Sequence, residues 1–188
     1  MAYLADGNRL AGLLFLILMG LCDILDGWVA RRTARASSFG AFLDSTIDRL
    51  TEGFVFLGFL VWFYRERDGK GLVLTSAALL FSYLVSYTRA RGENFIDHCK
   101  VGFWERPERL LCLMLALLLN RLKPALWMVA AGSFLTAFHR LCHLKASLTQ
   151  KALPQKGVPS LLFWSYPRFS IPYFLYCLIV ILLVLAIK

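Results

Sequence analysis

The chain has 188 residues, of which 59% are hydrophobic, and it carries a formal net charge of +9. This composition is too apolar for a water-soluble domain, so we expect a membrane protein. In such a protein a basic excess usually reflects cytoplasmic loops and anionic lipid head groups. No nucleic-acid-binding motif accompanies it, so no nucleic-acid partner is expected. The five cysteines are scattered without a C-x-x-C pair, which argues against disulfides and against a thiolate metal site.

Six apolar segments are each near the length that a bilayer requires. They predict an all-α polytopic bundle of about six transmembrane helices. The predicted spans are 10–30, 39–64, 71–88, 108–122, 124–144 and 171–187. Pro107 suits the start of the fourth span, because proline is favoured in the first turn of a helix.

The lysines and arginines are distributed unevenly between the two sides of this bundle. Residues 31–38, 89–109 and 140–168 hold thirteen of them, and the other loops and ends hold seven. The richer side is normally cytoplasmic, so the first span should end in the cytoplasm. We therefore expect a protein of the inner (cytoplasmic) membrane, with the surrounding lipids as partners.

Four aspartates stand in the first two predicted helices. The pattern reads D-x-x-D-G-x-x-A-R over 23–31 and G-x-x-x-D-x-x-x-D over 40–48, with eight residues between. This spacing puts the motif positions of each segment on one helical face. Carboxylates in an apolar span need a compensating cation or partner, and four that converge are typical of a two-metal site. The predicted ligands, in a cleft that faces the cytoplasm, are Asp23, Asp26, Asp44 and Asp48.

The full pattern resembles the signature of the CDP-alcohol phosphatidyltransferase family, and every signature position is matched. The resemblance implies a metal-dependent enzyme that transfers a phosphatidyl group from a CDP-linked lipid of the CDP-diacylglycerol type to a small polar alcohol and releases CMP. Mg²⁺ or Mn²⁺, as two ions, would neutralise the diphosphate, because hard cations prefer carboxylate oxygens. In the family the last aspartate is often the catalytic base. Asp48 is therefore a candidate for base or for metal ligand, and the sequence leaves both open. Family members are commonly homodimers, which makes a second copy of the chain a candidate partner.

Small and basic residues complete the aspartate face. Gly27 and Gly40 leave room where the backbone would meet the nucleotide, and Ala30 keeps the same face shallow. Arg31 can place two donors on a phosphate, anchor the helix on the cytoplasmic side, or do both. We expect these four residues to contact the CDP-lipid. Helix packing is the alternative role for the small ones.

A second basic cluster should border the same side. S-Y-T-R-A-R ends the third span at 86–91, E-R-P-E-R opens the fourth at 105–109, and Arg140 follows His139 in the fifth. Several arginines beside a metal cleft suggest an acceptor that carries its own phosphate. These segments look like elements of the phosphatidylinositol-phosphate synthase branch of the family. By that resemblance the phosphate of inositol phosphate would be bound by Arg89, Arg106, Arg109 and Arg140.

Three alternatives stay open at this point. Glycerol 3-phosphate is the second candidate acceptor, since it also carries a phosphate. Each arginine of the cluster could instead serve as a cytoplasmic anchor. A catalytically silent lipid-binding or interaction protein is the alternative to an enzyme. Four carboxylates in apolar helices are energetically unfavourable, which argues for a functional role.

The resemblance covers residues 9–147 and divides the chain in two. We expect a phosphatidyltransferase-like membrane domain at 1–147, lacking the usual first helix, and an interfacial linker with an additional helix at 148–188. Phe163, Trp164 and Tyr166 in the linker favour the membrane–water interface. We expect the helix at 171–187 to replace the missing first helix and to pack antiparallel beside the first span. A peripheral, lipid-facing helix is the alternative.

Overall fold

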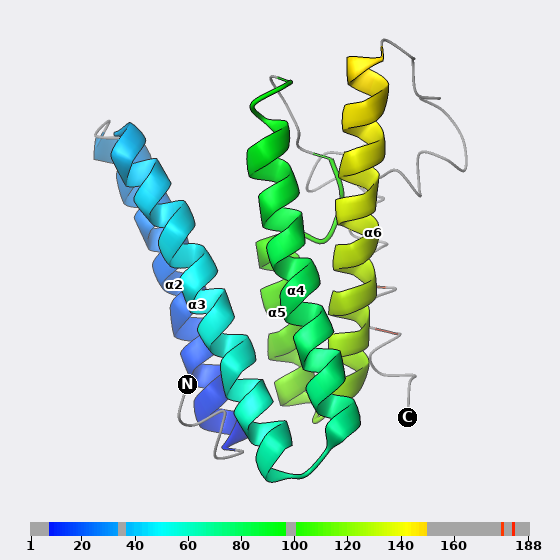
Figure 1. The fold of residues 1–188 in the computed structure, drawn as a ribbon. Coiled ribbons are helices and arrows are strands. Elements are labelled where there is room, and N and C mark those ends of the chain that lie inside the picture. The colour runs from blue at the N-terminus through cyan, green and yellow to red at the C-terminus, as the bar shows by residue number, and fades with distance from the viewer. Residues whose placement is uncertain (1–7, 34–36, 97–100, 150–177, 179–181, 183–188) are drawn as a thin grey trace.

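The fold comes from a computed structural model that describes residues 8–33, 37–96, 101–149, 178 and 182. Every regular element in this part of the chain is a helix. The order is α2 (Arg9–Thr33), α3 (Ser38–Arg65), α4 (Gly69–Gly92), α5 (Arg106–Leu118) and α6 (Leu122–Leu148) (Figure 1). On α2, the described side chains are those of Leu10–Cys22 and Leu25. The predicted helix at 171–187 and the linker aromatics Phe163, Trp164 and Tyr166 lie outside the described residues, except that Leu178 and Leu182 are helical.

The first five predicted spans each correspond to one helix, and the all-α class is confirmed. The predicted end of the fourth span is wrong, because α5 stops at Leu118 rather than at residue 122. Asn120 takes a left-handed conformation with φ of 56°. The N–H of Arg121 then donates to the carbonyl of Ala116, and the N–H of Asn120 donates to that of Leu117. This is a Schellman ending, in which asparagine is well tolerated at the left-handed position.

The turn from α3 to α4 ends in the same way and is tied to the turn before α6. Arg67 is left-handed at φ 53°, and the N–H of Asp68 donates to the carbonyl of Phe63. The Asp68 carboxylate caps α4 by accepting from the N–H of Gly71, and it lies 2.6 Å from Lys123 Nζ. The hydrogen bond from Lys123, with the one from Gly71, lowers the pKa of the Asp68 carboxyl.

Two of the described helices, α4 and α6, are long and apolar enough to cross a membrane by length and composition, and α2 contains a shorter apolar stretch, Leu10–Cys22. Large apolar side chains are also exposed on the outer faces of α2 and α3, among them Leu14, Leu18, Phe42 and Phe54. A soluble protein rarely exposes so much apolar surface, so the fold is that of a membrane-associated protein.

Helix α5 has 13 residues, which is about 20 Å of helix against about 30 Å of bilayer hydrocarbon. The stretch before it is not helical, but Val101, Phe103 and Trp104 are all buried. Irregular backbone at membrane depth is tolerated where protein covers it. The covering surface here is α6, where Thr136 Oγ1 accepts from the N–H of Trp104 at 3.2 Å.

Helices α4 and α6 lie side by side along most of their length (Figure 1). Many of their buried positions hold small residues, namely Thr75, Ala78 and Ser82 on α4 and Ala125, Ser133 and Ala137 on α6. Small side chains allow close backbone approach, which is how membrane helices gain packing energy without a hydrophobic drive between them. α3 meets α4 at their shared turn and diverges from it toward the other end of the bundle, where α2 ends and α3 begins (Figure 1).

Gly102 and Gly132 let the segment before α5 lie tightly on α6. Gly102 has φ of 105°, a conformation that favours glycine, and a Cβ at this position would lie 2.3 Å from Thr136 Cγ2. At Gly132 a Cβ would lie 2.1 Å from Trp104 Nε1.

We therefore expect Gly132→Ala to lower the stability of the bundle by about 1–3 kcal/mol, because the added methyl overpacks the Trp104 site. Thermal unfolding of the purified protein in detergent, followed by tryptophan fluorescence, measures this. Gly69→Ala is the matched control, since nothing lies within 4 Å of that position, and it should be neutral or slightly stabilising. Equal melting of Gly132→Ala and wild type would contradict the packing of Trp104 on α6.

Candidate active site

The aspartate pattern lies on the second half of α2 and the first turns of α3. Asp44 is exposed and Asp48 is half-buried, one turn further along α3 and on the same face. Asp23 and Asp26 belong to α2, but their side chains lie outside the described part, as do those of the predicted CDP-lipid contacts there, Gly27, Ala30 and Arg31. Within the described residues, no group of three or more His, Cys, Asp and Glu side chains could hold a metal ion. The predicted four-aspartate cluster therefore stays a prediction.

Gly40, the remaining predicted CDP-lipid contact, stands in the first turn of α3 and is exposed. Its N–H donates to the hydroxyl of the N-cap residue Ser37 at 3.0 Å. The cap begins α3 before Asp44, so both aspartates of α3 fall within its first three turns. Contact of Gly40 with a nucleotide stays a prediction.

Asp48 is ion-paired across the bundle to the start of α5. Its Oδ1 lies 2.6 Å from Arg106 Nη1, and Arg106 Nη2 donates to Thr51 Oγ1 at 3.2 Å. Both partners are half-buried. A charge-assisted contact this short is among the stronger polar interactions of a protein. It joins a residue predicted for the metal site to a residue predicted for the acceptor phosphate.

One turn further along both helices, a second pair repeats the contact in a buried setting. Arg109 Nε and Nη2 donate to the two oxygens of Glu52 at 2.7 Å and 2.9 Å, and Arg109 Nη1 donates to the carbonyl of Trp104 at 3.0 Å. The Arg109 side chain is only 1% exposed. A two-pronged pair of this kind is geometrically specific, because the planar guanidinium matches the carboxylate.

Glu105 connects the other two arginines of the cluster. Its Oε1 accepts from Arg140 Nη2 at 2.8 Å and from Arg89 Nη1 at 3.3 Å. Arg140 also donates to two backbone carbonyls, from Nε to Val101 at 2.8 Å and from Nη1 to Val85 at 2.6 Å. Arg140 thus ties α4, the segment before α5 and α6 together.

The structure therefore brings the four predicted arginines to one region and links this region to Asp48. Glu52 and Glu105, which hold three of the four arginines, were not predicted as site residues. Glu52 continues the i, i+4 series of Asp44 and Asp48 on α3, so its spacing was a usable signal. Phosphate contact of the arginines remains a prediction, and the contacts with protein acceptors give Arg109 and Arg140 a structural role in addition.

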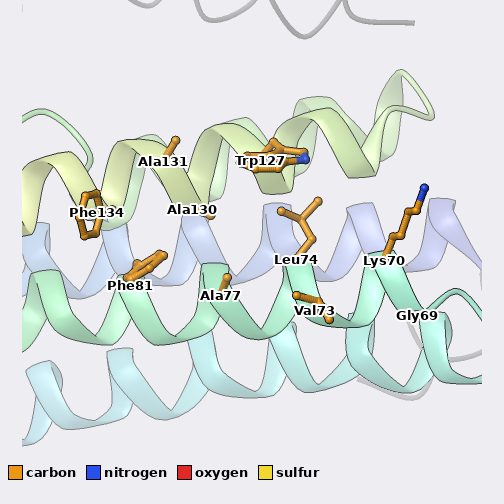
Figure 2. A pocket seen from close by; sticks show the side chains of 10 residues that line it. All are labelled: Gly69, Lys70, Val73, Leu74, Ala77, Phe81, Trp127, Ala130, Ala131 and Phe134. Carbon is orange, nitrogen blue, oxygen red and sulfur yellow. The ribbon is translucent and has the colours of Figure 1, made fainter.

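A separate groove lies between α4 and α6, with a volume of about 810 Å³ and an almost wholly apolar lining. Figure 2 shows Leu74, Phe81, Trp127 and Phe134 around it and Lys70 at one end. It starts at Gly69, at the opposite end of α4 from Arg89. The groove is therefore not part of the aspartate–arginine region.

The helical bundle and its exposed apolar faces define a membrane-associated protein, and the carboxylate–guanidinium region is its candidate active site. The family model for CDP-alcohol phosphatidyltransferases matches residues 1–139, and the chain belongs to this family of enzymes. The archaetidylinositol phosphate synthase of Methanothermobacter thermautotrophicus is 35% identical over 146 residues, which cover 74% of this chain and 72% of that one.

Two solved structures of the phosphatidylinositol phosphate synthase of Mycobacterium tuberculosis are also similar. One, with CDP-DAG bound, superposes with a TM-score of 0.70 at 33% identity and covers 76% of each chain. The other, in complex with manganese and citrate, has a TM-score of 0.70 at 31% identity and covers 86% of this chain and 84% of that one.

We expect Glu52→Leu to destabilise the protein by about 3–5 kcal/mol, because it leaves the Arg109 charge buried without its carboxylate. The double variant Glu52→Leu/Arg109→Met should recover much of the loss, since a buried pair can often be replaced by apolar residues of similar size. Thermal unfolding of the single and double variants in detergent measures both effects. If the double variant is no more stable than Glu52→Leu, the pair is not what makes that substitution costly.

Proposed function

We propose that the protein transfers a phosphatidyl group from a CDP-linked lipid of the CDP-diacylglycerol type to a phosphorylated alcohol of the inositol phosphate type. The hydroxyl oxygen of the acceptor attacks the lipid-side phosphorus, the bond from that phosphorus to the oxygen of CMP breaks, and CMP leaves. The observation that carries the proposal is the 2.6 Å contact of Asp48 with Arg106, because it joins the aspartate motif to the arginine cluster. The names of the two relatives support inositol phosphate as the acceptor.

The donor set fits a divalent metal. Asp44 and Asp48 place carboxylates one turn apart on α3, and carboxylate oxygens are preferred by Mg²⁺ and Mn²⁺. We propose that Asp23, Asp26, Asp44 and Asp48 hold two such ions, and the manganese in the relative's structure supports the choice of metal. When bound, the ions supply positive charge that neutralises the diphosphate. Asp48 would serve as a metal ligand or accept the proton of the attacking hydroxyl.

The bound lipid would lie against α2 and the start of α3. We propose that Gly27, Ala30 and Gly40 give the nucleotide close access to the backbone and that Arg31 donates to the diphosphate. The exposed first turn of α3 at Gly40 supports this, because a ligand can approach it.

In the acceptor site, we propose that Arg89 and Arg106 contact the phosphate most directly. Their side chains are 36% and 17% exposed, whereas those of Arg109 and Arg140 are 1% exposed. Arg109 and Arg140 would add positive potential and hold the segment before α5 in place. A phosphate between these residues would be bound at the end of the bundle where α4 ends.

We further propose a bundle of about six membrane spans in the inner membrane, whose active site opens to the cytoplasm. The excess of lysine and arginine in 31–38, 89–109 and 140–168 supports this orientation. Exposed apolar side chains on α2 and α3 would contact membrane lipids or a second copy of the chain in a homodimer.

The acceptor is tested with purified protein, CDP-diacylglycerol and Mn²⁺, by measuring CMP release with inositol phosphate, glycerol 3-phosphate, free inositol and serine. We expect inositol phosphate to be preferred, because free inositol and serine carry no phosphate that the arginines could bind. Preference for glycerol 3-phosphate would keep the phosphate site and change the acceptor. Equal reaction of free inositol or serine would overturn the phosphate site.

Substituting Asp23, Asp26 or Asp44 by Asn should lower CMP release by on the order of a thousandfold each, since a two-metal site loses a charged ligand. Asp68→Asn is the matched control. Asp68 caps α4 at the other end of the bundle, asparagine caps equally well, and activity should stay near wild type. A near-normal rate for any of the three variants would rule that residue out as a ligand.

Substituting Arg89 or Arg106 by Ala should raise the acceptor KM by about tenfold or more, because a charge-assisted hydrogen bond contributes roughly 1.5–3 kcal/mol. The KM for CDP-diacylglycerol should change by less than about twofold, because the lost hydrogen bond contributes to the binding of the acceptor and not to that of the lipid. Arg91→Ala controls for general loss of positive charge, because Arg91 stacks over Phe95 on the exposed end of α4. Equal rises in both KM values would contradict an acceptor-specific role.

A further inference from the structure

The contact between Arg106 and Asp48 bears on the order in which metal and acceptor bind. This inference rests on the proposed function. The guanidinium occupies one oxygen of a carboxylate that the reaction needs for metal binding or for proton acceptance. A divalent ion and a guanidinium on one carboxylate repel each other, so the contact with Arg106 weakens the binding of metal by Asp48.

Arg106 differs from Arg109 in how readily it can change partner. Arg109 is fixed by three hydrogen bonds in a buried site, and leaving Glu52 would strand two buried charges. The pair of Arg106 and Asp48 is half-buried, so water and ligands can reach it, and its cost of separation is lower. Arg106 also lies at the start of α5, next to Glu105, which contacts Arg89 and Arg140.

We propose that Arg106 is a coupling residue that holds Asp48 until the phosphorylated acceptor arrives. The acceptor phosphate, as a dianion, then draws the Arg106 guanidinium to itself. Asp48 is released to the metal ions and to the attacking hydroxyl. The phosphate and the metal therefore bind cooperatively through this one side chain.

This coupling would protect the CDP-lipid from hydrolysis. Without it, water could attack the lipid-side phosphorus in place of the acceptor hydroxyl, with formation of phosphatidate and release of CMP. With Asp48 held by Arg106, the aspartate set is complete only when the acceptor is in place, as in other enzymes whose correct substrate assembles the site.

The test measures binding rather than turnover. Mn²⁺ is titrated into detergent-solubilised protein without lipid, and free Mn²⁺ is followed by its electron paramagnetic resonance signal. The titration is repeated with saturating inorganic phosphate, after subtraction of the weak Mn²⁺–phosphate complex measured without protein. Phosphate binding itself is measured by calorimetry, with and without Mn²⁺.

In wild type, phosphate should raise the affinity for Mn²⁺ about tenfold, within the range of typical coupling between sites. Arg106→Gln should bind Mn²⁺ about tenfold more tightly than wild type in the absence of phosphate, and phosphate should then change the affinity less than about twofold. Arg91→Gln removes an equal charge at the same end of α4 without touching Asp48, and it should keep the wild-type coupling.

Several results would overturn the coupling. Phosphate that binds to wild type without changing its affinity for Mn²⁺ would do so, and so would an Arg106→Gln protein that binds Mn²⁺ no more tightly than wild type. A rise in Mn²⁺ affinity in Arg91→Gln as large as in Arg106→Gln would reduce the effect to net charge. Phosphate that fails to bind with or without Mn²⁺ would overturn the proposed acceptor site as well, which separates the two failures.

Asp48→Asn gives an independent arm if Arg106→Gln does not fold. Without the carboxylate charge, Arg106 is held less strongly, so phosphate should bind about tenfold more tightly than to wild type in the absence of metal. Unchanged phosphate affinity in Asp48→Asn would overturn the coupling by itself.

Discussion

Two carboxylate–guanidinium pairs join α3 to α5, one turn apart along both helices: Asp48 with Arg106 and Glu52 with Arg109. Seven of the 13 residues of α5 are buried, and the two pairs add polar contacts between α5 and α3. The pair of Glu52 and Arg109 is buried, and charged groups in a poorly solvated site interact strongly and are costly to separate. α5 also packs on α2 and α6, so these pairs set how the aspartate-bearing helices stand relative to the arginine cluster.

Helices α4 and α6 pack together and support the segment before α5 and the arginine cluster. Small buried residues let them approach closely, and Arg140 on α6 donates to the carbonyls of Val85 on α4 and Val101. Two hydrogen bonds hold the non-helical stretch before α5 on α6. Arg140 Nε donates to the carbonyl of Val101, and the N–H of Trp104 donates to Thr136 Oγ1. Glu105 and Arg106 follow directly from that stretch. Their positions therefore depend on packing within the bundle, which is the kind of support that a preorganised site requires.

Much of this fold could be predicted from the sequence, because lipid exposure imposes long apolar helices. The end of α5 could not, since it depends on the left-handed conformation of Asn120, which hydropathy does not encode. The motif spacing predicted that Asp44 and Asp48 share a face of α3. It did not predict which carboxylate each arginine would meet, because that depends on how α5 is set against α3. Asp48 and Glu52 lie on the same helical face, and each meets a different arginine of α5.

The arginine cluster shows how one residue type serves two purposes at different depths. Arg109 and Arg140 are 1% exposed and have three protein acceptors each, so they cannot change partner without leaving buried charges or carbonyls uncompensated. Arg106 is 17% exposed and Arg89 is 36% exposed, and carboxylates held at that depth can be replaced by a better anion. An arriving phosphate offers more negative charge than Asp48 or Glu105 alone. In the proposed acceptor site, this gradient of burial would separate the arginines that hold the fold from those that exchange a carboxylate of the protein for a phosphate of the substrate.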